Sequence, residues 1–210
     1  MFGIPGATFS VVVTNTVNSV TSSSATLTVN GGGGGTTLLE AHFDGGADSF
    51  AYADDVFKAT VQPTYASGTQ LPAGGFAGGG VQVLLGGING SNIQKMSGGW
   101  QRSFSVATAG PTTLTFRYKL GITGLKSDRF GQMLVSLNGV LYGVTPNTYI
   151  AQLNGGLGGV TTTTGWQQVQ INLGTLPAGT HVLSLGGYLS GKSGSSETSD
   201  VIVDDVVVTQ

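Results

Sequence analysis

Short runs of alternating β-branched and polar residues, each ended by glycine, asparagine or proline, recur along almost the whole chain. A period of two is typical of strands, whereas a helix needs apolar residues at i, i+3, i+4 and i+7. Glycine or proline interrupts nearly every window in which a helix could form. The clearest predicted strands are residues 9–14, 25–29, 81–85, 112–119, 133–137, 167–173, 181–185 and 201–208. Many short strands joined by regular turns indicate an all-β, antiparallel sandwich or barrel.

Composition excludes several functional classes. The 210 residues include 37 Gly and no Cys, and only 9% are charged, against about 25% in a typical domain. A net charge of −2 with eight scattered Lys and Arg argues against nucleic acid as a partner. No apolar run approaches the ~20 residues of a membrane span. The absence of cysteine excludes a disulfide framework but leaves the compartment open.

Small polar residues replace Lys and Glu at positions that are usually on the surface, which suits an extracellular bacterial module. The first residues, Met1 to Pro5, have neither the basic nor the apolar region of a signal peptide. We therefore expect a protein that is secreted or displayed on the cell surface, and we expect this chain to be part of a longer exported one.

Five consecutive glycines at residues 31–35 divide the chain, because such a run behaves as a flexible linker. The predicted organisation is a hairpin in residues 1–30, a linker in 31–37 and a sandwich in 38–210. The run FSVVVTNTVNSVTSSSATLTV before the linker resembles the closing hairpin of bacterial immunoglobulin-like domains. A lone hairpin is marginally stable in water. It is expected to dock on the following domain, pair with another chain or stay mobile, unless it marks only a boundary.

Four motifs occur in a characteristic order after the linker. They are Leu38-Leu-Glu-Ala-His-Phe-Asp-Gly, Phe116-Arg-Tyr followed by residues 133–139, Gly165-Trp-Gln-Gln-Val, and Val201-Ile-Val-Asp-Asp-Val. Together they resemble the C-terminal jelly-roll modules of secreted bacterial multidomain proteins, which are similar in layout to carbohydrate-binding modules and to MAM-type sandwiches. The resemblance implies an antiparallel jelly-roll β-sandwich.

Catalytic motifs are missing from the sequence. Hydrolysis of a glycoside needs two carboxylates that flank the scissile bond. Glutamate occurs only at Glu40 and Glu197, and histidine occurs only at His42 and His181, without nucleophile-elbow or metal-ligand spacing. We expect a non-catalytic protein.

Asp204 and Asp205 lie inside a predicted strand that is apolar on both faces. Strict alternation puts Val201, Val203 and Val207 on one side and Ile202, Val206 and Val208 on the other. At least one carboxylate then points inward, and a buried charge must be paired or bind a metal. Calcium prefers such oxygen ligands. The alternative is that both side chains lie near a strand end and meet solvent or backbone N–H groups.

The resemblance adds a specific ligand set to this prediction. In the modules that this chain resembles, the closing strand lies beside the opening strand and helps to form a structural calcium site. Carried over to this sequence, that implies Asp204, Asp44 and Asp205 as ligands of Ca²⁺.

A polar face is predicted along residues 166–173. Alternation puts Val169, Ile171 and Leu173 inward, and leaves a set of one aromatic and three amide side chains outward: Trp166, Gln168, Gln170 and Asn172. An aromatic ring can stack on a sugar, and amides can bond its hydroxyls in both directions. Tyr142 is a further candidate near a loop. The alternatives are a strand face that is simply solvated and a core position for Trp166.

Two functional hypotheses follow. The first is a non-catalytic extracellular module that binds a polysaccharide or a cell-surface glycan and holds a structural calcium ion. The second is a structural or adhesive module of a cell-surface or filamentous assembly, in which residues 1–30 self-associate by adding a strand to a neighbouring sheet.

Overall fold

The computed structural model describes residues 7–23, 25–27, 35–156 and 160–210. The chain divides into two compact units, Met1–Gly35 and Thr36–Gln210. The predicted linker, residues 31–37, crosses this boundary, and its residues 31–34 lie outside the described part. Among the described residues, no helix is long and apolar enough to cross a membrane.

The N-terminal unit contains two short antiparallel strand pairs. β1 (Ala7–Phe9) pairs with β4 (Ala25–Leu27), and β2 (Val12–Thr14) pairs with β3 (Ser19–Thr21). The Asn15 side chain closes the turn between β2 and β3, because its Oδ1 accepts the N–H groups of Val17 and Asn18 at 2.8 Å each. The hairpin inferred from the sequence therefore forms, but it is divided into strands of three residues.

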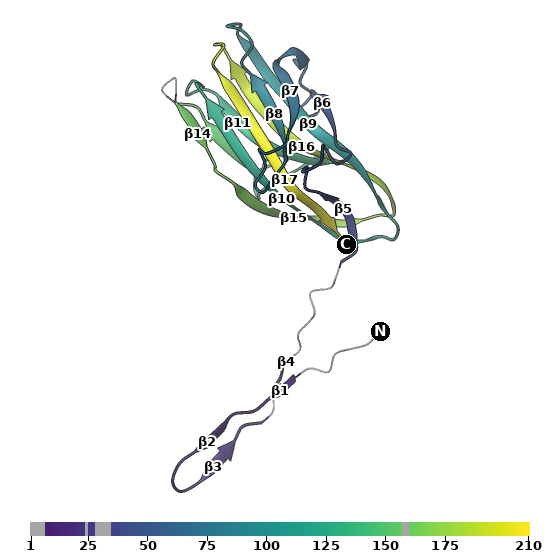
Figure 1. Cartoon of the computed structure of the whole chain (residues 1–210), viewed down its shortest axis with the longest axis vertical. Coiled ribbons are helices and arrows are strands. Elements are labelled where there is room, and N and C mark those ends of the chain that lie inside the picture. Colours follow the sequence, from purple (N-terminus) through teal and green to yellow (C-terminus); the bar gives the residue numbers. More distant parts are fainter. Residues whose placement is uncertain (1–6, 24, 28–34, 157–159) are drawn as a thin grey trace. The chain divides into compact units, whose positions relative to one another are not determined.

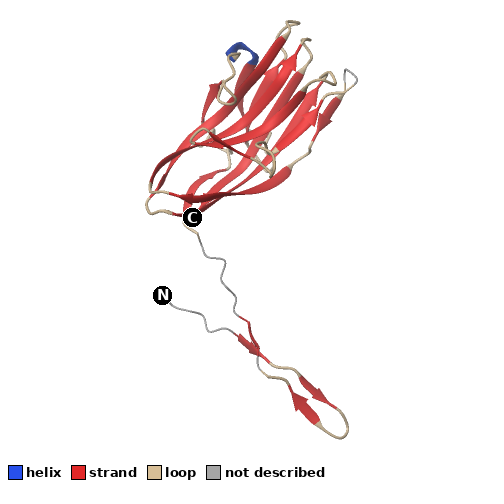
Figure 2. Ribbon diagram, turned by 180° about the vertical axis from the view of Figure 1, so that it is seen from behind, coloured by secondary structure: helices blue, strands red, loops and turns tan. Residues whose placement is uncertain are grey.

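The C-terminal unit is a sandwich of a seven-stranded and a six-stranded sheet (Figures 1 and 2). The seven-stranded sheet has the order β14 (Thr161–Thr163), β10 (Gly110–Thr123), β17 (Thr198–Thr209), β8 (Gly80–Gly86) and β7 (Ala66–Leu71), with β15 (Gln167–Leu176) on β10 and β5 (Thr37–Ala41) on β17. The six-stranded sheet has the order β12 (Val140–Tyr142), β11 (Phe130–Leu137), β16 (Gly179–Lys192), β9 (Ile93–Val106) and β6 (Ala51–Asp54), with β13 (Ala151–Asn154) on β11. One 3-10 helix, η1 (Pro63–Tyr65), precedes β7. The predicted antiparallel jelly-roll β-sandwich is confirmed.

The core lies between the two sheets and follows the predicted period of two. Strand β10 shows this clearly, because its buried residues alternate with partly exposed ones over most of its length. The main core includes Leu39, Val83, Leu85, Trp100, Leu114, Phe116, Leu120, Met133, Val135, Leu183, Leu185, Val201, Val203, Val206 and Val208. Alternation therefore marks the inward residues of β10, whereas β11 and most of β16 are buried at consecutive positions.

The closing strand β17 departs from strict alternation. Val206 and Val208 pack in the same core as Val201 and Val203, so the predicted division of this strand into two sides is wrong. The cause is an irregularity in the pairing with β10, where the register shifts after Val207 and resumes at Asp204. Asp205 has a positive φ of 50° at this point. An extra residue in one strand, a β-bulge, reverses which face the following side chains take.

A run of glycines lets strands β9 and β16 approach closely at their centre. Gly98 and Gly99 of β9 lie opposite Gly187 and Gly186 of β16. A Cβ added to Gly186 would clash with the carbonyl oxygen of Gly98, which is backbone and cannot rotate away. Gly186 is therefore needed for the packing of this sheet.

We predict that Gly186→Ala lowers the free energy of unfolding by about 1–3 kcal/mol, the usual cost of overpacking. Urea denaturation followed by tryptophan fluorescence measures the change. Gly45→Ala is the matched control, since a Cβ there would meet no atom within 4 Å. Equal stability of the two variants would show that the β9–β16 contact tolerates a methyl group.

Candidate functional site

The β-bulge in β17 separates the two adjacent aspartates. Asp204 is fully buried, with 0% of its surface exposed. Its Oδ2 accepts the N–H groups of Phe76 at 2.8 Å and Ala77 at 3.2 Å, and its Oδ1 accepts the N–H of Asp205 at 2.7 Å. Burial raises the pKa of Asp204, while these backbone N–H groups act in the opposite direction. The carboxylate is thus held by backbone N–H groups, which the sequence analysis named as an alternative to calcium.

Residues 72–79, which we call the glycine loop, connect β7 to β8 and pack against two carboxylates. Besides the Asp204 bonds, Asp44 Oδ1 accepts the N–H of Gly79 at 2.8 Å. A Cβ on Gly75 would lie 2.7 Å from Asp204 Oδ2, and a Cβ on Gly78 would clash with Asp44 Oδ1. These glycines therefore allow the backbone to reach both carboxylates, a role that no sequence motif had indicated.

The predicted calcium ligands do not all meet. Asp204 and Asp44 contact the same glycine loop, but Asp205 bonds to Arg117 and His42 instead. Among the described residues, no three His, Cys, Asp or Glu side chains gather where they could hold a metal ion. Calcium takes six to eight oxygen ligands, and the two carboxylates on the loop already accept N–H bonds. The side chains that the structure brings together are too few to form a calcium site by themselves, and the ion stays a prediction.

Asp205 organises a short chain of charges at the surface. Its Oδ2 accepts a hydrogen bond from Arg117 Nε at 3.2 Å, and its Oδ1 lies 2.9 Å from His42 Nδ1. His42 Nε2 lies 3.0 Å from Glu40 Oε1. The hydrogen bond with Asp205, followed by that with Glu40, raises the pKa of His42 to about 8. At pH 7 His42 is therefore mostly protonated, and both sides of Asp205 face a positive charge.

An aromatic pair lies beside this chain of charges. Phe76 of the glycine loop is 46% exposed, and its ring meets that of Trp166 edge to face, with centroids 6.0 Å apart. The guanidinium of Arg117 lies 3.9 Å from the Phe76 ring centroid. The ammonium of Lys119 lies 5.5 Å from the Trp166 ring centroid. Both distances are in the range of cation–π contacts.

These side chains belong to the surface of the seven-stranded sheet that points away from the core, which we call the outer face. Arg117 and Lys119 alternate along β10 with the buried residues Phe116, Tyr118 and Leu120, so they project outward. A groove of about 320 Å³ lies on the same face and is lined by His42, Thr115, Phe116, Arg117, Gln168, Asp205 and Val207. The outer face thus combines aromatic, cationic and amide groups beside a groove.

Four of the five predicted ligand residues occur on this face or next to it. Gln168, Gln170 and Asn172 are exposed on β15, whereas Ile171 and Leu173 are buried as predicted. Trp166 just before β15 is only partly buried and packs against Phe76 rather than in the core.

Tyr142 lies apart from the other predicted ligand residues. It ends β12 in the six-stranded sheet, is partly buried, and donates a hydrogen bond to the carbonyl oxygen of Leu173 at 3.3 Å. The structure thus gives Tyr142 a packing contact and does not bring it to the outer face.

Sequence reasoning missed Phe76, Arg117 and Lys119. Alternation in residues 112–119 contained a signal for Arg117 and Lys119, because it puts both on the face opposite Phe116. Phe76 offered no such signal, since its position depends on how the glycine loop bonds to Asp204.

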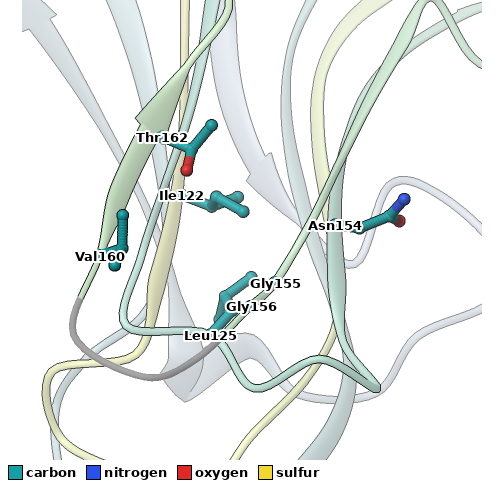
Figure 3. Close-up of a pocket in the computed structure, with 7 residues that line it drawn as sticks. All are labelled: Ile122, Leu125, Asn154, Gly155, Gly156, Val160 and Thr162. Atoms are coloured by element: carbon teal, nitrogen blue, oxygen red, sulfur yellow. The ribbon is translucent and has the colours of Figure 1, made fainter.

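A second hollow, of about 230 Å³, lies between the end of β10 and the start of β14 (Figure 3). Its lining is Ile122, Leu125, Asn154, Gly155, Gly156, Val160 and Thr162. None of the described residues in its lining is charged. The outer face is therefore the better candidate site.

Comparison with known proteins finds no matching family model and no match among curated proteins. Among solved structures, the module TmCBM61 in complex with β-1,4-galactotriose is similar at 12% identity and a TM-score of 0.44, covering 83% of this chain and 98% of that chain. The K1 cleaved adhesin domain of Lys-gingipain from Porphyromonas gingivalis W83 is similar at 16% identity and a TM-score of 0.41, with the same two coverages. A carbohydrate-binding module of Cellvibrio mixtus lichenase 5A in complex with cellotriose is similar at 11% identity and a TM-score of 0.31, covering 83% of this chain and 98% of that chain. At these values the function has to be inferred from the residues of this chain.

The calcium prediction has a direct test. An ion that binds only the folded chain stabilises it by about 2.7 kcal/mol at a concentration of 100 Kd, so EDTA is expected to lower the melting temperature and added Ca²⁺ to restore it. Differential scanning fluorimetry measures the shift, with Mg²⁺ as the control ion. A melting temperature that does not respond to EDTA would contradict the calcium prediction, and the backbone N–H groups would then be the partners that stabilise the buried Asp204.

Proposed function

We propose that residues 36–210 form a non-catalytic, extracellular glycan-binding module that holds a saccharide on its outer face. The observation that carries the proposal is the aromatic pair of Phe76 and Trp166, which is flanked by the cations Arg117 and Lys119. It lies on the same face as a groove whose lining includes the amide of Gln168.

Each kind of side chain on the outer face has a use in binding a sugar. An aromatic ring offers a large apolar surface on which the C–H face of a pyranose can stack. Amide groups donate and accept hydrogen bonds, so Gln168, Gln170 and Asn172 can bind hydroxyl groups in either direction. Because these amides follow one another along β15, a saccharide chain could contact several of them in turn.

The charges in the groove support binding rather than hydrolysis. Glycoside cleavage needs one protonated and one ionised carboxyl group on opposite sides of the bond. Asp205 is the one carboxylate among the residues that line the groove, and it is paired with Arg117 and His42. Asp204 is buried and bonded to backbone N–H groups.

A second candidate function rests on the N-terminal unit. No charged residue precedes Glu40 in the sequence, and the described part of the hairpin exposes five valines by 58–89%: Val11, Val12, Val13, Val17 and Val20. Uncharged strands with unpaired edges readily add to another sheet. We propose, as the alternative, an adhesive or structural role in which this hairpin pairs with a neighbouring chain.

We predict that Trp166→Ala and Phe76→Ala each weaken saccharide binding roughly tenfold, about 1.4 kcal/mol, because each removes half of the stacking surface. A polysaccharide array identifies the ligand, and isothermal titration calorimetry measures its affinity. Tyr142→Phe is the control, since it removes only the hydroxyl group of a predicted ligand residue on the other sheet. Unchanged binding in both alanine variants would exclude the outer face as the site.

The alternative predicts oligomers whose amount rises with concentration and that disappear when residues 1–30 are deleted. Light scattering coupled to size-exclusion chromatography measures the mass. Val13→Lys puts a charge on strand β2 and is expected to weaken assembly, whereas Val17→Lys adds the same charge in the turn and is the matched control. A monomer at all concentrations would refute the adhesive role.

A further inference from the structure

We infer that the saccharide bound on the outer face is acidic and carries a carboxylate, as in a polyuronate. This inference rests on the proposed function and concerns the same site. It starts from a difference between the charged groups on this face. The carboxylates have partners within the protein, whereas the cations keep N–H donors that have none.

The negative charges on and beneath the outer face have partners within the protein. Asp204 accepts three backbone N–H groups, and Asp205 is held by Arg117 and His42. Asp200 on β17 is partly buried, and burial raises its pKa, while the charge of Lys119 and a hydrogen bond with Gln82 act against that rise. None of these three carboxylates is left without a donor or a nearby cation.

Lys119 is in a different position. Its ammonium group lies over the indole of Trp166 and its charge acts on Asp200, but within the described residues it makes no hydrogen bond and has no carboxylate within 4 Å. An ammonium group carries three donors and no acceptor. These donors lie beside the aromatic pair on which the proposed saccharide stacks.

Arg117 keeps donors of its own. Its Nε is used by Asp205, but its two terminal amino groups have no acceptor among the residues described. Guanidinium groups bind carboxylates through paired N–H donors. Arg117 and Lys119 are two residues apart on β10 and therefore project from the same face, about 7 Å apart along the strand. Two cations at this spacing beside a stacking platform suit a chain that repeats a carboxylate.

A competing hypothesis gives both cations a purely structural role. On that hypothesis their cation–π contacts only fix the two rings, and the charge of the ligand does not matter. Oligosaccharides that differ only at C6 distinguish the two hypotheses. β-1,4-Mannuronan and β-1,4-mannan are one such pair and β-1,4-glucuronan and cello-oligosaccharides are another, each with a carboxylate in the first member and a hydroxymethyl group in the second.

We expect the acidic member of at least one pair to bind about ten times more tightly than its neutral counterpart at 50 mM NaCl, with a smaller ratio at 500 mM because salt screens exposed charges. Lys119→Gln and Arg117→Gln should each weaken acidic binding about fivefold or more and change neutral binding less than about twofold. Lys119→Arg should restore acidic binding. Lys126→Gln, which removes the same charge from an exposed loop, is the control and should change neither.

Each other outcome has a defined meaning. If neutral members bind as well as acidic ones, or if Lys119→Gln leaves acidic binding unchanged, the inference is overturned while glycan binding on the outer face stands. If no glycan on the array binds, or if Trp166→Ala and Phe76→Ala both leave glycan binding unchanged, the proposed function itself fails, and the inference fails with it.

Discussion

The arrangement of the outer face depends on the hydrogen bonds that the carboxylate of Asp204 accepts from backbone N–H groups. A fully buried charge is tolerated only with strong partners, and here three backbone N–H groups supply them. Two of those groups belong to the glycine loop, so the bonds that satisfy Asp204 also place Phe76 above the sheet. The bulge in β17 makes this possible, because it puts two consecutive aspartates on the outer side of the sheet, with Asp204 beneath the glycine loop and Asp205 beside Arg117.

The sequence predicted what depends on local pattern. Alternation identified the sandwich, the inward residues Ile171 and Leu173, and the outward amides of β15. It failed in β17, because a bulge changes the phase of a strand without leaving a mark in residue type. It also could not place Phe76, which reaches the outer face through bonds to a residue 128 positions later in the chain.

The outer face shows how a chain with few charges can still build a specific surface. Charged residues make up only 9% of the sequence, yet Arg117, Lys119, Asp205 and His42 gather beside one groove and one aromatic pair. Elsewhere along β15, amides take the exposed positions. Because amides are polar without being charged, they offer hydrogen bonds on this face without adding to the charges that already surround the groove.

The pairing of the opening strand with the closing strand has a mechanical consequence. Strand β5 runs antiparallel to β17, with Thr37 opposite Thr209, and Gln210 donates its N–H to the carbonyl oxygen of Thr36 at 3.0 Å. The two ends of the sandwich therefore emerge side by side. A pulling force applied to both ends would load one hydrogen bond of this ladder at a time, as in opening a zip, rather than all of them together in shear. Hydrogen bonds that are loaded one at a time separate at a lower force than hydrogen bonds that are loaded together in shear.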